Sequence, residues 1–151
     1  MVLDINKEYY ESIKEYICKN VDKVFKKPSK RFKYPFIDPG SIYDGNLWDW
    51  DSFWTVYALT AHEKTLNDGG VFKKKLIESG MGNVLNFFSF QLEDGYIPMM
   101  VSNDIQGEDE ESYLIRKHKE GEILNMHKPF LCQQSCLVSG LKGSFSWLEN
   151  Y

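Results

Sequence analysis

Apolar residues recur every three to four positions in several stretches of this chain, and this periodicity limits its possible folds more than any other pattern. The first stretch spans Lys7 to Lys26 and carries charged residues on the opposite side. Such spacing predicts an amphipathic helix. The next stretch, Lys27 to Asn46, contains three prolines and two glycines. So many breakers predict an ordered loop or a tether rather than a helix or a central strand.

A second and a third helix are predicted on either side of a strong breaker. The second is expected to begin within residues 49–52 and to end near Thr65, before the sequence Asn67-Asp68-Gly69-Gly70. The third is expected over residues 71–92. Its buried side is predicted to consist of seven apolar side chains: Leu76, Ile77, Met81, Val84, Leu85, Phe88 and Leu92.

The last part of the chain continues the helical pattern. A fourth helix is expected from Pro129, a favourable first helical residue, to Leu141. Ser144 has the character of an N-cap for a fifth helix that has only begun over residues 147–151. Its apolar side chains would have nothing to pack on, which favours a truncated single domain over residues 1–151. No strand-turn-strand pattern is evident, so the predicted class is all-α, built of helical hairpins.

Composition narrows the possible partners. The formal net charge is −4, and the lysine-rich part is confined to about residues 19–33, so no basic face for nucleic acid is expected. The N-terminus lacks a basic segment followed by an apolar run, and no apolar stretch is long enough to span a membrane. A cytoplasmic protein without a membrane partner is therefore expected. The aromatic fraction of 15% is high, which indicates that the protein uses flat apolar ring surfaces for packing or binding.

The three cysteines, Cys18, Cys132 and Cys136, are an odd number without a framework spacing, which predicts reduced thiols. Cys132 and Cys136 are four residues apart and His127 lies nearby, but a fourth ligand at a familiar zinc spacing is missing. Buried helix thiols are the preferred interpretation, and no metal is expected. The glycines near residue 40 lack the lysine of a phosphate-binding loop, so no nucleotide or other cofactor is expected.

The densest chemical signal lies in residues 38–54, which contain three tryptophans, one tyrosine and four aspartates. A sugar offers an apolar face and a rim of hydroxyls, so aromatic plates beside carboxylates suit it. We expect Asp51 to accept sugar hydroxyls while Trp48 and Trp50 line the same pocket. Asp49 and Asp51 are too close in sequence to flank a scissile bond as a catalytic pair. The alternative is that either aspartate caps a helix and the tryptophans are core.

A family resemblance rests on three motifs. These are Tyr34-Pro35-Phe36 through Trp48-Asp49-Trp50-Asp51-Ser52-Phe53-Trp54, then Gly95-Tyr96-Ile97-Pro98, then Asn125-Met126-His127-Lys128-Pro129. Together they resemble the start of the (α/α)6-barrel domain of glycoside hydrolase family 63 and its trehalase-like relatives. The resemblance runs from about residue 30 to the end, and the Trp-Asp string is its most specific part.

This resemblance implies a fold and a set of site residues. The helical hairpins would form an incomplete portion of an (α/α)6 toroid. The residues implied in a sugar subsite are Trp48, Trp50, Asp51, Tyr96 and either Gln133 or Gln134. Lys128 is a further candidate for positioning a substrate hydroxyl, with an ordinary solvated lysine as the alternative.

The resemblance also implies an inverting hydrolysis of α-linked glucosides, mannosides or trehalose. Its general acid and its glutamate general base are expected on later hairpins, beyond Tyr151, so the isolated chain is expected to be inactive. The expected partners are a small glycoside or oligosaccharide and the missing C-terminal part of the same domain. Two alternatives stay open: a non-catalytic sugar-binding helical module, and a structural helical protein whose Trp and Asp residues are core and caps.

Overall fold

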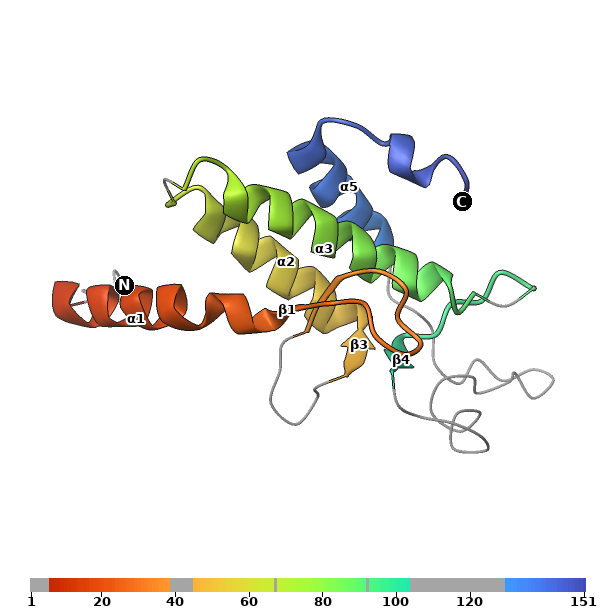
Figure 1. Ribbon diagram of the computed structural model, residues 1–151, viewed down its shortest axis with the longest axis horizontal. Helices are drawn as coiled ribbons and strands as arrows, with labels where there is room; N and C mark the ends of the chain where they lie inside the picture. Colours follow the sequence, from red (N-terminus) through yellow and green to blue (C-terminus); the bar gives the residue numbers. More distant parts are fainter. Residues whose placement is uncertain (1–5, 39–44, 67, 92, 104–129) are drawn as a thin grey trace, which may run out of the picture.

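A computed structural model describes residues 6–38, 45–66, 68–91, 93–103 and 130–151 of the chain (Figure 1). Its helices are α1 (Lys7–Asn20), α2 (Asp49–Glu63), α3 (Val71–Phe88) and α5 (Phe130–Lys142), with single 3-10 turns at Val21–Val24 and Ser146–Leu148. Its strands are β1 (Phe25–Lys26), β2 (Phe36–Ile37), β3 (Asn46–Trp48) and β4 (Met100–Ser102). The described part is mainly helical, as predicted.

Two small sheets depart from the all-α prediction. β1 pairs with β2 and β3 pairs with β4, both antiparallel. The first pair also explains why α1 ends at Asn20 rather than at Lys26. Phe25 pairs with Ile37, and the backbone N–H of Asp38 donates to the carbonyl of Val24 at 2.9 Å. The segment predicted as the end of the helix therefore forms its backbone hydrogen bonds with the loop that follows.

Asp68 fixes the start of α3. Its carboxylate accepts hydrogen bonds from the N–H groups of Gly70 at 3.0 Å and Phe72 at 2.7 Å. These N–H groups at the helix start have no partner within the helix, so the carboxylate satisfies them. Gly69 and Gly70 adopt the left-handed conformation that glycine tolerates best. The predicted breaker between the second and third helices is therefore confirmed, with a physical cause.

Helices α2, α3 and α5 pack against one another and enclose the core. One cluster of buried apolar side chains lies between α2, α3 and α5 and includes Val56, Leu76 and Val138. The other lies beside β3 and β4 and includes Leu47 and Val101. Figure 1 shows α3 beside α2, with α5 crossing the far side of α3. The predicted buried side of the third helix is largely confirmed, except that Leu92 lies outside the described residues.

Two buried asparagines of α3 hold the proline-containing loop in place. Asn83 accepts from the N–H of Ile37 at 2.7 Å and donates to its carbonyl at 3.2 Å. Asn86 forms the same pair of bonds with Tyr34, at 3.2 and 3.1 Å. Each side-chain amide thus satisfies a backbone N–H and a backbone C=O of this loop, although Ile37 also belongs to β2, which pairs with β1. A Cβ atom at Gly82 would lie 1.7 Å from the carbonyl oxygen of Pro35, so only glycine permits this approach.

The C-terminal segment packs on the ends of α3 and α5. The indole Nε1 of Trp147 donates to the hydroxyl of Ser139 at 2.9 Å. The ring of Tyr151 stacks on Phe88 with 5.1 Å between ring centroids, although Tyr151 stays exposed. A single 3-10 turn stands where a fifth helix was predicted to begin. The expectation that these apolar residues lack partners is therefore wrong for Trp147 and holds for Phe145, which is exposed.

Helix α1 extends away from the other helices (Figure 1). None of its residues is buried, so the apolar side predicted for it exists but is uncovered. Across the described ranges, no helix combines the length and the apolar character that a membrane crossing requires.

Candidate functional site

Residues that follow the second and third motifs lie against the first motif where β3 joins α2, and the third motif itself, residues 125–129, lies outside the described residues. Trp48, the last residue of β3, pairs with Met100 of β4. The N–H of Asp49 donates to the carbonyl of Met99 at 2.9 Å, so the segment after Tyr96 lies against the start of α2. The ring of Phe130, at the start of α5, approaches that of Trp50 to 4.9 Å between centroids. Residues distant in sequence thus converge on one end of α2.

Trp48 is partly buried at this junction. Its ring packs against the core cluster that contains Leu131, and Ile97 packs on the same cluster. Its indole Nε1 is buried and has no hydrogen-bond partner in the part of the chain that the structure describes. An N–H in this state is costly unless a ligand or water satisfies it, so Trp48 offers one donor to a bound molecule.

The two aspartates of the motif have different environments. Asp49 is buried, and its Oδ1 accepts a hydrogen bond from the N–H of Trp50 at 2.7 Å, so it serves the start of the helix. Asp51, in the first turn of α2, is only partly buried. Its carboxylate has no hydrogen-bond or ion-pair partner among the residues with described positions. The N-cap of α2 is Trp48, so the alternative that an aspartate caps this helix is wrong, although Asp49 bonds within the first turn and Asp51 stays available to a ligand.

Trp50 belongs to a strip of exposed aromatic rings along α2. Trp50, Trp54 and Tyr57 follow at helical spacing and are 46%, 45% and 53% exposed. Neighbouring centroids in the strip are 6.1 and 5.9 Å apart. Phe130 of α5 also touches Trp50 and Trp54. The alternative that all the tryptophans are core is therefore wrong for Trp50 and Trp54.

Tyr96 is partly buried in the turn that leads toward β4. Its N–H donates to the carboxylate of Asp94 at 2.9 Å, which fixes the turn. Burial of the hydroxyl, and to a smaller extent the charge of Asp94, raises the pKa of Tyr96 above its usual value. The hydroxyl therefore stays protonated at neutral pH and can donate a hydrogen bond.

The structure separates the two glutamine candidates. Gln133 is exposed on α5. Gln134 is fully buried, and its Nε2 donates to the carbonyl of Gly80 at 3.2 Å, so it ties α5 to α3. Gln133 is thus the accessible member of the pair. Lys128 lies outside the described residues.

An apolar hollow of about 400 Å³ adjoins the junction. Ile97 and Leu131, which belong to the cluster under Trp48, also line this hollow. Its other walls include Phe88 and Tyr151. The neighbours of Tyr96 and Gln133 therefore border a space with almost purely apolar walls.

The cysteines and possible metal ligands give no further site. Cys18, Cys132 and Cys136 are free and exposed, so the expectation of buried thiols on α5 is wrong. Among the residues that the structure describes, no group of three or more His, Cys, Asp or Glu side chains is arranged to hold a metal ion.

Sequence reasoning missed the clamp formed by Asn83 and Asn86 and the exposure of the aromatic strip. Two asparagines three residues apart on the apolar side of a predicted helix are a signal for the clamp, since buried amides need partners. The spacing of Trp50, Trp54 and Tyr57 places them on one helix face. Which face is covered depends on the neighbouring helices.

Comparisons with models of protein families, with curated proteins and with solved structures give no match. The resemblance to glycoside hydrolases therefore stays a prediction from the sequence motifs.

Proposed function

We propose that this chain supplies sugar-binding residues of a glycoside hydrolase that acts on α-linked glucosides, mannosides or trehalose. The observation that carries the proposal is the partly buried carboxylate of Asp51, which follows Trp50 in the sequence and has no partner among the described residues. A carboxylate accepts hydrogen bonds from two adjacent sugar hydroxyls, and an exposed indole face covers the apolar C–H groups. The start of α2 combines both groups.

Candidate hydrogen-bond donors elsewhere at the junction suit the same ligand. Trp48 offers a buried indole N–H that has no partner among the described residues. Tyr96 has a hydroxyl that stays protonated at neutral pH. Gln133 is exposed on α5, the helix whose first residue touches Trp50. A sugar presents hydroxyls that both donate and accept, so a mixed set of donors and one acceptor carboxylate suits it.

In this proposal the chain binds sugar but does not cut it. Glycoside hydrolysis needs two carboxyl groups on opposite sides of the scissile bond, roughly 6.5–9.5 Å apart for inversion. Asp49 is committed to the backbone of α2, which leaves Asp51 as the free carboxylate of the motif. The acid and base would come from later hairpins of an (α/α)6 toroid, and the exposed strip of Trp54 and Tyr57 suits the packing of further helices.

The test combines a binding and a hydrolysis assay on the same chain. Trehalose, an α-glucoside and an α-mannoside are titrated while tryptophan fluorescence is recorded, and the same solutions are assayed for released sugar. The expected result is saturable binding of at least one sugar without hydrolysis. Hydrolysis by the 151-residue chain would place the catalytic carboxylates within it, and absence of binding to every sugar would refute the proposal.

A further inference from the structure

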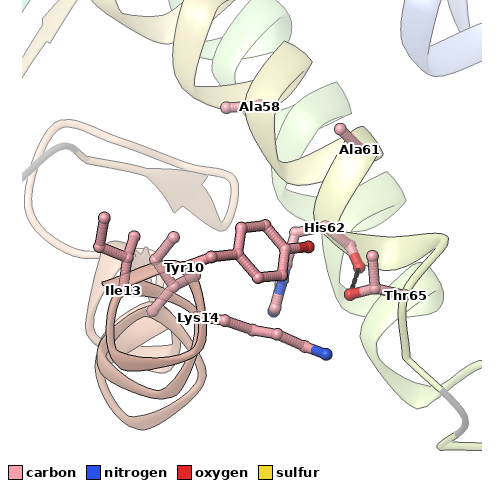
Figure 2. A pocket seen from close by; sticks show the side chains of 8 residues that line it. Tyr10, Ile13, Lys14, Ala58, Ala61, His62 and Thr65 are labelled. Carbon is pink, nitrogen blue, oxygen red and sulfur yellow. Dashed lines mark hydrogen bonds between the residues drawn. The ribbon is translucent and has the colours of Figure 1, made fainter. Parts of the chain in front are cut away.

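A second hollow lies between α1 and the C-terminal half of α2 (Figure 2). It is distant along α2 from the sugar-binding candidates, which sit at the first turn of that helix. Its volume is about 260 Å³. This is slightly below the roughly 300–1,000 Å³ of pockets for drug-sized ligands, so it suits a small molecule.

Apolar side chains form one part of the wall. Ile13 and Ile17 project from α1, and Ala58 and Ala61 present only methyl groups from α2. Ile13 and Ile17 are 59% and 41% exposed, so neither side chain is covered by the rest of the chain. Small residues on α2 opposite branched residues on α1 leave room that the protein does not fill. An apolar body of a ligand would gain by covering these groups.

Polar groups gather in the other part of the hollow. Figure 2 shows the side chains of Tyr10 and Lys14 extending from α1 toward His62, near the end of α2, and Thr65, just beyond it. The ring of His62 packs edge-on against Phe72 at 5.4 Å, which fixes its orientation. Its Nε2 is buried and lacks a hydrogen-bond partner among the described residues. A buried unpaired nitrogen costs free energy that a ligand with a matching group would recover.

The charge of the side chains that line the hollow indicates the charge that a bound ligand should carry. Lys14 carries the positive charge of the lining, and none of the described lining side chains is acidic. Within the described ranges Lys14 forms no ion pair, whereas Lys19 on the same helix pairs with Glu15 at 2.7 Å. An ammonium ligand would be repelled by the positive charge of Lys14. A neutral alkyl ligand would leave Nε2 of His62 unpaired. A carboxylate satisfies both groups.

We propose that the hollow between α1 and α2 binds a small carboxylate with an apolar body, such as a medium-chain fatty acid. Its carboxylate accepts hydrogen bonds from Nζ of Lys14 and Nε2 of His62, and its chain covers Ile13, Ile17 and the two alanines. The ligand would join α1, which has no buried residue of its own, to the helical core.

Titration calorimetry with octanoate and with octanol tests this proposal. Octanol has the same alkyl chain without the charge. Octanoate is expected to bind saturably and octanol at least about tenfold more weakly, because hydrogen bonds to charged groups each contribute about 1.5–3 kcal/mol. Lys14→Met is expected to weaken octanoate binding roughly 10- to 100-fold and to leave octanol unchanged. Lys14 is exposed, so the variant is expected to fold normally.

Lys19→Met is the matched control. It removes the same charge from the same helix, but Lys19 is bonded to Glu15 and does not line the hollow. It is expected to bind octanoate as the unchanged chain does. Bound octanoate should also slow hydrogen exchange of the α1 amides. Equal loss in both variants, equal binding of octanoate and octanol, or no saturable binding would each overturn the proposal.

Discussion

At the scale of single residues, the fold places Asp49 and Asp51 in different environments. Asp49 is buried against the backbone of Trp50, while Asp51 is two positions further along the first turn and its carboxylate has no partner within the described ranges. The Trp-Asp pattern in the sequence already favours Asp51 as the sugar acceptor, and the family resemblance implies the same residue. The structure supplies an independent physical reason for the same choice, because only an unpaired carboxylate can bind a ligand without losing an existing bond.

Gly82 offers a residue-scale test of the close contact between α3 and the loop. In Gly82→Ala the new Cβ would meet the Pro35 carbonyl, a backbone atom that cannot rotate away. We expect a loss of about 1–3 kcal/mol in the free energy of unfolding, measured by urea denaturation, since overpacking costs this much.

Gly140 provides the matched control for that substitution. It lies in α5, and a Cβ there would meet nothing within 4 Å. Gly140→Ala is expected to raise the free energy of unfolding by roughly 0.5–1 kcal/mol, because alanine favours the helix. If both variants changed stability in the same direction, the close contact at Gly82 would not be the cause.

At the scale of elements, the helices were predictable and the strands were not. Apolar spacing and a breaker with a local cause, such as Asp68 before α3, mark helices in the sequence. The strands are two or three residues long, so they are too short to show an alternation of apolar and polar residues. Their pairing depends on partners that are distant in sequence, such as Met100 for Trp48. The exposure of α1 was not predictable either, because its apolar spacing predicts a helix but does not say which element covers it.

The asparagine clamp gives the element-scale prediction. In Asn83→Ala the buried N–H and C=O of Ile37 lose their partners. Unsatisfied buried groups cost about 1–3 kcal/mol each, so we expect a loss of at least about 2 kcal/mol in urea denaturation. Asn86→Ala should cost less, because the bonds to Tyr34 are only partly buried. A larger loss for Asn86 would contradict this view of the clamp.

At the scale of the whole molecule, the described helices build a core but leave two large surfaces uncovered. One is the aromatic strip on α2, and the other is the apolar side of α1. Monomeric soluble proteins rarely expose extended apolar patches, and such patches usually mark contacts with other elements or ligands. The incomplete toroid and the sugar site are proposals that give the α2 strip a role. The carboxylate site gives one to α1.

The carboxylate of Asp51 is the most direct test of the sugar-binding account. Asp51→Asn keeps the shape of the side chain and removes its charge, and Glu78→Gln removes an exposed charge from α3 as a control. Both are titrated with the sugar that the unchanged chain binds best. We predict that Asp51→Asn weakens binding roughly tenfold or more while Glu78→Gln leaves it unchanged, since hydrogen bonds to charged groups contribute about 1.5–3 kcal/mol. Equal sugar affinity in Asp51→Asn and the unchanged chain would contradict the account.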